Sequence, residues 1–365
     1  MQPQPSFTAI KSIPEIYNEC HTIAHLSSRV KGDDTVNHAL NCKIAREREW
    51  QRKISTAVNC EQIVTMALEK AGQDASLVHK KKVAKQIVHQ EYQDAWNSHL
   101  KSLLMQGEYT RVMEMQETDL VWKSAIFNLP KGVLKFMLNS TLNTLPTKDN
   151  LTRWGKRLSK SCSSCGRAEY LSHVLNACPT SLKEGRYTWR HDSVLSQISA
   201  LLEQVIRGSP CEIHIDLGNV AWTVPPDIIP TSSRPDLVIV NRESKTCHIL
   251  ELTVPYESNI DSEHTYKENK YGSLLNDIEQ TGWNTQYCAL EIGSRGSITK
   301  SNNDRFKSFV NRVSKDVKVK VKCKAVRGFT KDLAKVASMC SYTIFKAKDF
   351  TWNDPKPLKL SASYV

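Results

Sequence analysis

Several features are missing from this sequence, and each absence excludes a class of protein. No run of about 18 consecutive apolar residues occurs, so we expect no membrane-spanning helix. The first residues, MQPQPSFTAIKSIPEIY, lack the basic start and apolar core of a secretory signal peptide. Because no export signal accompanies the 11 cysteines, we expect buried thiols or metal ligands in a reducing compartment rather than disulfides.

The composition indicates a folded, basic protein. Of the 365 residues, 40% are hydrophobic and 24% are charged, which is typical of globular rather than disordered chains. The formal net charge is +12, so nucleic acid is the first partner to test. Residues 301–365 contain 15 Lys and Arg against 5 Asp and Glu, so this segment alone supplies +10 of that charge.

In the densest part of this basic segment, valines alternate with lysines. Lys318, Lys320 and Lys322 would share one face if residues 317–324 formed a strand. A row of lysines on one face matches the spacing of backbone phosphates, so we expect these three side chains to contact nucleic acid. The alternative is a lysine-rich surface that only faces solvent.

The patterns of apolar residues divide the chain into five expected segments. In order, they are a loose lead-in (1–33), a helical linker domain (34–158), a small zinc-binding segment (159–186), an α/β domain (187–315) and a basic C-terminal segment (316–365). The α/β assignment rests on strands that alternate with helices from about residue 187 onward.

Individual elements are expected as follows. Strands are predicted near 211–217, 236–241, 247–254 and 287–292, and helices near 117–128, 131–143, 188–207, 262–280, 303–315 and 329–346. A further helix is predicted by apolar residues that recur every four positions: Val88, Tyr92, Trp96, Leu100 and Leu104. We expect this stripe to pack into a core.

Four metal-ligating residues lie close together in the pattern C-x2-C-x7-H-x4-C: Cys162, Cys165, His173 and Cys178. Thiolates two residues apart can bind one tetrahedral ion from a tight turn, and Gly166 suits that turn. Three thiolates and one imidazole leave no open coordination position, so a zinc ion here would be structural. The alternative is four residues that share this spacing by chance.

Basic residues precede this cluster. Arg153, Lys156 and Arg157 lie a few residues before the first cysteine. We expect them to contact nucleic acid, since a small zinc module with a basic flank can bind phosphates.

Two acids occur within apolar stretches of the α/β domain. Asp236 precedes the run Leu-Val-Ile-Val, and Glu251 interrupts the run His-Ile-Leu-Glu-Leu. A carboxylate among apolar residues is costly to bury unless it is paired or binds a cation, and two on adjacent strands suit Mg²⁺. The next helix offers Lys267 and Lys270 on one face as the cation beside them. The alternative is a pair of surface acids on edge strands.

These acids resemble the motif of the PD-(D/E)xK nucleases. In the usual pattern, a lysine lies two residues after the second acid, but this sequence has Thr253 there. The simple motif is therefore incomplete.

The order of the motifs resembles the C-terminal part of the polyprotein of site-specific non-LTR retrotransposons that carry a restriction-like endonuclease. The resembling stretches are 129–154, the C-x2-C-x7-H-x4-C segment, Arg190-His191-Asp192, Arg234-Pro235-Asp236, 251–257, 267–271 and 291–296. In that family the catalytic lysine lies on the following helix. The resemblance therefore implies a PD-(D/E)xK core over 187–315, Asp236 and Glu251 as ligands of a catalytic Mg²⁺, Lys270 as the displaced lysine and Lys267 as a second candidate. We also assign Arg190 and His191 as nucleic-acid contacts.

The resemblance implies a metal-dependent endonuclease that nicks duplex DNA in the nucleus, with structural zinc, catalytic Mg²⁺ and element RNA as a further partner. The sequence contains no convincing reverse transcriptase motif, because Lys31-Gly-Asp33-Asp34 is not followed by a β-branched strand. We therefore expect a truncated element, a domesticated copy or a mis-assigned gene. The alternative function is an inactive nucleic-acid-binding protein of the same origin.

Overall fold

The computed structural model divides the chain into two compact units. The first comprises Met1–Leu103 and the second Leu104–Val365. The residues described are 13–32, 60–116, 129–218, 222–319, 323–353 and 355–360. The boundary at Leu103 falls inside the helical linker expected from the sequence. In the described part of the chain, no helix has the length and apolar character needed to cross a membrane.

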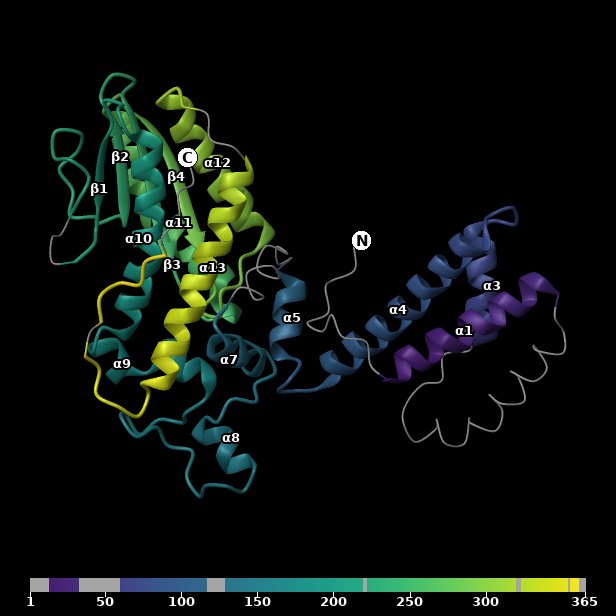
Figure 1. The fold of residues 1–365 in the computed structure, drawn as a ribbon. Coiled ribbons are helices and arrows are strands. Elements are labelled where there is room, and N and C mark those ends of the chain that lie inside the picture. Colours follow the sequence, from purple (N-terminus) through teal and green to yellow (C-terminus); the bar gives the residue numbers. More distant parts are fainter. Residues whose placement is uncertain are drawn as a thin grey trace. The chain divides into compact units, whose positions relative to one another are not determined.

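The first unit contains three described helices: α1 (Ile13–Lys31), α3 (Cys60–Ala71) and α4 (Leu77–Ser102) (Figure 1). Helix α4 begins where the Ser76 hydroxyl accepts a hydrogen bond from the His79 N–H, a typical N-cap. The core is formed by apolar residues of all three helices: Leu26, Ile63, Val64, Ala67, Val83, Ala84, Ile87 and Val88. The expectation of a loose lead-in over 1–33 is therefore wrong for α1.

The apolar stripe of α4 is only partly buried. Val88 and Leu100 are buried, but Trp96 is 52% exposed, and Leu104, which follows the end of α4, is 80% exposed. The core of the first unit includes α4 residues only as far as Tyr92, so the stripe continues beyond the helices that cover it. The four-residue spacing correctly predicted a helix. The expectation that the whole stripe packs into a core was wrong.

The second unit begins with short helices: α5 (Glu108–Met115), α7 (Lys131–Thr141), α8 (Lys148–Arg153), the π-helix η1 (His173–Ala177) and α9 (Pro179–Lys183). The predicted helix at 131–143 is confirmed as α7, whereas the one at 117–128 lies outside the described residues. Thr147 caps α8, because its hydroxyl accepts the Asn150 N–H.

A mixed four-stranded sheet forms the centre of this unit. Its strands are β1 (Glu212–Ile215), β2 (Leu237–Asn241), β3 (Thr246–Thr253) and β4 (Asn284–Glu291), in the order β1-β2-β3-β4. The pairs β1–β2 and β2–β3 are antiparallel, and β3–β4 is parallel. All four expected strands are confirmed, and the domain is a mixed α/β structure.

Helices cover both faces of the sheet (Figure 1). Helices α10 (Arg186–Ile206), α12 (Lys300–Asp316) and α13 (Cys323–Lys346) pack on one face, where they share a core with Leu250 and Leu252. The 3-10 turn η2 (Glu257–Asn259) leads into α11 (Ile260–Gln280), which packs on the other face against Cys247 and Ile249. The side chains of β3 thus alternate between two cores, which explains why this strand is apolar on both faces.

The described residues 317–319 and 323–324 do not form the strand that would place the lysines of 317–324 on one face. Helix α12 ends in a Schellman motif, in which the Val319 N–H donates to the Ser314 carbonyl and Lys318 adopts a left-handed φ of 58°. Cys323 then begins α13, whose apolar side belongs to the main core, so this helix of the expected C-terminal segment packs with the α/β domain. Lys320 and Lys322 lie outside the described residues.

Candidate zinc and acidic sites

The first two ligands of the C-x2-C-x7-H-x4-C segment lie in a tight hairpin. Ser161 and Ala168 form an isolated β-bridge, and the Cys162 N–H donates to the Arg167 carbonyl at 2.7 Å. Within this hairpin, Gly166 has a φ of +76° and donates its N–H to the Cys162 carbonyl at 3.0 Å. Glycine suits this left-handed position, and the turn brings both thiols to one side.

The other two ligands come from consecutive short helices. His173 begins η1, and Cys178 is the residue before the first turn of α9. One hydroxyl holds both positions: Tyr187 Oη accepts the Cys178 N–H at 3.0 Å and lies 3.2 Å from the His173 carbonyl. Sequence analysis gave Tyr187 no role, because a supporting residue outside a ligand pattern has no characteristic spacing.

The four side chains fit a tetrahedral zinc ion. Their ligand atoms all lie within 4.8 Å of one another, and Cys165 Sγ is 3.3 Å from His173 Nε2. Ligands at about 2.3 Å from one zinc ion would be separated by distances of this order. We refer to residues 159–186 as the zinc knuckle. Cys162, His173 and Cys178 are buried, as in a closed structural site.

The local electrostatics favour metal-binding protonation states. Burial raises the pKa of the Cys178 thiol, but hydrogen bonds from Ser181 and Thr180 at the start of α9 outweigh it, so the net shift is downward. Burial lowers the pKa of His173, which keeps the imidazole neutral. Burial raises the pKa of Cys165, and this thiol must lose its proton on binding.

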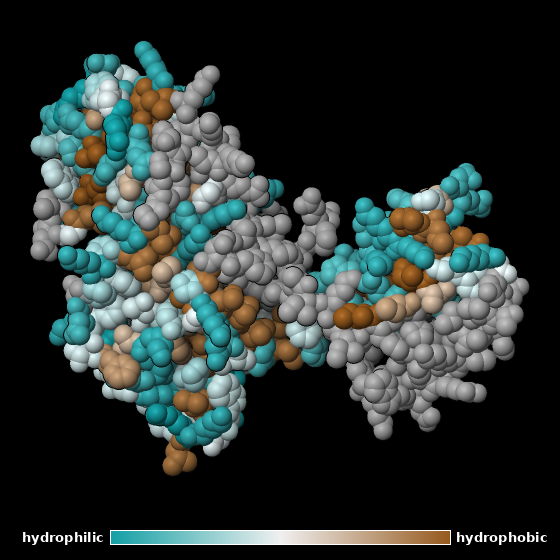
Figure 2. All heavy atoms as spheres, in the orientation of Figure 1, coloured by the Kyte–Doolittle hydropathy of each residue, from teal (hydrophilic) through white to brown (hydrophobic). Residues whose placement is uncertain are grey.

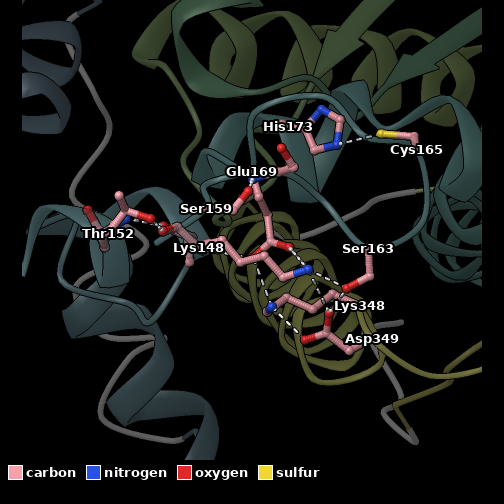
Figure 3. A network of polar contacts seen from close by, with 12 residues as sticks. Lys148, Thr152, Ser159, Ser163, Cys165, Glu169, His173, Lys348 and Asp349 are labelled. Carbon is pink, nitrogen blue, oxygen red and sulfur yellow. Dashed lines mark hydrogen bonds and ion pairs between the residues drawn. The ribbon is translucent and has the colours of Figure 1, made fainter. Parts of the chain in front are cut away.

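A partly buried ionic network joins the zinc knuckle to the residues that follow α13 (Figure 3). Lys348 Nζ lies 2.8 Å from Glu169 Oε1 and 2.7 Å from Asp349 Oδ2. Lys148 contacts Ser163 and lies 3.7 Å from a carboxylate oxygen of both Glu169 and Asp349. Two lysines and two acids neutralise one another here, so the C-terminal residues stabilise the knuckle.

The basic residues before the knuckle remain accessible. Arg153, Lys156 and Arg157 are exposed, and among the described residues only Arg153 has a close acid, with its Nε 3.1 Å from Asp149 Oδ2. Figure 2 shows mainly hydrophilic side chains over the part of the second unit where α8 and α9 lie. The structure places these side chains where a phosphate could reach them.

The two acids of the sheet lie opposite each other. The register pairs Leu237 with Leu250, so the next step places Asp236 opposite Glu251. The Asp236 N–H donates to Glu251 Oε2 at 3.2 Å, and the Leu252 N–H donates to Asp236 Oδ2 at 2.6 Å. The backbone of each strand therefore holds the carboxylate of its neighbour. We refer to Asp236 and Glu251 as the acid pair.

Each acid has its own cation. Lys267 Nζ, from α11, lies 2.5 Å from Glu251 Oε1, and His191 Nε2, from α10, lies 3.3 Å from Asp236 Oδ2. The other ring nitrogen of His191 lies 3.1 Å from Asp192 Oδ1. His191, which we expected to contact nucleic acid, thus lies within the acid site.

Burial and charge act together on these groups. Burial and the nearby Asp236 raise the pKa of Glu251, and Lys267 only partly offsets the rise. For His191, burial alone would lower the pKa, but Asp236 and Asp192 raise it to about 10, so the ring is charged at neutral pH. Lys267 and His191 therefore offset part of the charge of the acid pair, since His191 also pairs with Asp192.

Lys270 approaches the acid pair indirectly. Its Nζ lies 3.0 Å from the Tyr271 hydroxyl and 4.6 Å from the centre of that ring. Lys267, ranked second by sequence analysis, is the lysine in direct contact with Glu251. The two lysines lie one helical turn apart. The orientation of α11 about its axis determines that Lys267, rather than Lys270, contacts Glu251.

The assignment of Arg190 as a nucleic-acid contact is contradicted. Arg190 is 1% exposed, and its guanidinium donates to Ser341 Oγ at 3.0 Å and to the Val254 carbonyl at 3.1 Å. It joins α10 to α13 and to the end of β3. A buried arginine bonded on both sides cannot reach a phosphate.

Two further charged clusters were not predicted. Arg295 and Glu257 form a buried pair, with Nε 2.6 Å from Oε2, and the Arg295 N–H also donates to Glu257. Glu291 lies 3.0 Å from His264 Nδ1 and 3.1 Å from an Arg305 nitrogen. Glu291 ends an apolar strand much as Glu251 interrupts one, and this pattern could have identified it.

The donor set of the acid pair suits a hard cation. Two carboxylates can bind Mg²⁺, which commonly takes its remaining ligands from water and substrate phosphates. The Asp236 side chain is partly exposed, so such ligands can approach. In the described part of the chain, the knuckle is the one place where three or more Cys, His, Asp or Glu ligands converge. A cation at the acid pair would therefore need water or substrate phosphates as its remaining ligands.

Comparison with known proteins identifies the knuckle region. Residues 92–184 match the family zf-RVT, described as zinc-binding in reverse transcriptase. The match extends from α4 to the end of α9 and includes all four zinc ligands. No curated protein matches the chain. The expected association with retrotransposons is confirmed for this region, which is a zinc-binding domain of the type found with reverse transcriptases.

Proposed function

We propose that this protein is a metal-dependent endonuclease of the PD-(D/E)xK type that nicks duplex DNA. The observation that carries the proposal is the arrangement of Asp236, Glu251 and Lys267, which places two acids and one lysine at one end of the two central strands of a mixed sheet. The zf-RVT match supports a retrotransposon origin, in which a nick supplies a 3′ hydroxyl to prime reverse transcription. Nuclear localisation and binding of element RNA belong to the same proposal.

Asp236 and Glu251 would hold Mg²⁺ through their carboxylates. When bound, this ion polarises the phosphodiester and lowers the pKa of a coordinated water. The Lys267 ammonium would move from Glu251 toward the phosphate and stabilise the negative charge that develops there. His191 would hold Asp236 in place through its contact at 3.3 Å.

Affinity for DNA would come from basic residues outside this site. Arg153, Lys156 and Arg157 are exposed beside the knuckle, and Lys318 is exposed at the end of α12. Contacts to phosphates give affinity for all sequences alike. Binding and cleavage should therefore be separable by mutation.

A second function is favoured by one observation. The acid pair already has a cation for each carboxylate, as expected of a structural ionic cluster in an inactive nucleic-acid-binding protein. The two functions differ in whether the acids are needed for turnover.

A plasmid-nicking assay with Mg²⁺ tests the proposal. Wild-type protein should convert supercoiled DNA to the nicked form, and Asp236→Ala should not. Asp227→Ala is the matched control, because Asp227 is an exposed acid paired with Arg242. Absence of nicking by the wild type, with DNA binding intact, would favour the inactive binding protein.

A further inference from the structure

The Tyr271 hydroxyl lies beside the chain segment that carries Asp236. Its ring is fully buried on the α11 face of the sheet, where it packs with Val238, Ile249 and Leu274. The Tyr287 ring centre lies 5.9 Å away. This packing fixes the ring, so the position of the hydroxyl is determined by the core.

Two hydrogen-bonding groups meet this hydroxyl. It donates to the Arg234 carbonyl at 3.0 Å, and it lies 3.0 Å from Lys270 Nζ. Arg234 lies two residues before Asp236, so the hydroxyl holds the segment that carries this acid.

The hydrogen-bonding capacities of these groups determine which of them donates and which accepts. A phenol has a single proton, and Tyr271 donates it to the Arg234 carbonyl. The Lys270 ammonium can only donate, so it binds the phenol oxygen and makes the O–H a stronger donor. The charge of Lys270 thus strengthens the hydrogen bond from Tyr271 to the Arg234 carbonyl.

We propose that Tyr271 is a positioning residue that holds the Arg234–Asp236 segment, and with it Asp236, in place, and that Lys270 acts through it rather than on the phosphate. This inference rests on the proposed endonuclease function. A supporting hydrogen bond of this kind typically changes metal affinity or activity by about 10–100-fold.

The test is a double-mutant cycle on the full chain. We expect Tyr271→Phe and Lys270→Ala each to slow Mg²⁺-dependent nicking by about 10-fold or more and to raise the Mg²⁺ concentration for half-maximal rate. The nicking rate of the double variant should lie within about twofold of that of the slower single variant, since both substitutions remove the same interaction. Tyr266→Phe, which removes an exposed hydroxyl from the same helix, should stay within about twofold of wild type.

Three results would overturn the inference. The first is that Tyr271→Phe nicks at the wild-type rate. The second is that the double variant loses the product of the two single losses. The third is a thermal unfolding midpoint so low that Tyr271→Phe is unfolded in the assay.

A calorimetric Mn²⁺ titration separates this inference from the proposed function. If the wild type does not nick, the endonuclease proposal fails, and about 10-fold weaker Mn²⁺ binding by Tyr271→Phe would still support the positioning role. Equal Mn²⁺ affinity, or no Mn²⁺ uptake by the wild type, would contradict it.

Discussion

Lys267 Nζ lies 2.5 Å from Glu251 Oε1, and this contact offsets the charge of a buried carboxylate. Glu251 is 3% exposed and lies beside Asp236, so its charge would be costly without a partner. Lys267 supplies that partner from α11, and His191 does the same for Asp236 from α10. Any cation that enters must therefore displace or share these contacts.

Replacing Lys267 should have a larger effect than replacing Lys270. Lys267→Ala leaves Glu251 buried without its direct cation and removes the charge nearest the proposed phosphate site, so we expect nicking to fall by at least about 100-fold. Lys300→Ala, at an exposed position on α12, is the control. Initial rates on supercoiled plasmid measure the effect, and a larger loss in Lys270→Ala would restore Lys270 as the principal lysine.

Removal of zinc should unfold the knuckle. Three thiolates and an imidazole can contribute folding free energy on the order of 10 kcal/mol. We expect one zinc per chain by metal analysis, and Cys178→Ser should lose it and become sensitive to proteolysis around residues 159–186. Cys20→Ser is the control, since Cys20 is exposed in the other unit. A zinc-free protein with an intact, protease-resistant knuckle would contradict the assignment.

The buried pair of Glu257 and Arg295 should contribute to stability rather than to DNA affinity. Arg295→Ala leaves a buried carboxylate unpaired and removes the guanidinium from between Tyr109 and Tyr256, so it should lower the free energy of unfolding by about 3–5 kcal/mol. Urea denaturation measures this loss. Unchanged stability together with weakened DNA binding would indicate that Arg295 contacts DNA instead.

The free energy of unfolding should decrease as the pH is lowered below about 6.5, and His248 should contribute to this decrease. Burial lowers the pKa of this imidazole, and the contact with Asp316 at 3.1 Å only partly opposes that shift. As the pH falls, the unfolded chain therefore binds a proton before the folded chain does, which favours unfolding. Urea midpoints at pH 7 and pH 5.5 should differ less in His248→Gln than in the wild type, and an equal difference would exclude this contribution.

The sequence predicted elements whose determinants are local. The zinc ligands lie within 17 residues, and tetrahedral coordination requires little beyond their spacing and a turn at Gly166. Asp236 and Glu251 were identifiable because each adjoins an apolar run. Their positions opposite each other follow from the register of the β2–β3 hairpin. The sequence suggests the hairpin but does not determine its register.

Predictions that depend on tertiary packing were less successful. Arg190 resembles a surface cation in sequence, but α13 and the end of β3 cover it. The alternating valines and lysines after 316 favour a strand, yet Val317 and Lys318 complete the end of α12. The choice between Lys267 and Lys270 depends on how Tyr271, Leu274 and Ile278 orient α11.

The central claim is that the acid pair performs chemistry and does not merely stabilise the fold. The most direct test compares Glu251→Gln with the wild type for Mg²⁺-dependent nicking and for affinity toward the same duplex. We expect nicking to fall by at least about 100-fold while the dissociation constant changes by less than about threefold, because affinity comes from basic residues elsewhere. Equal nicking rates for the two proteins would contradict the account.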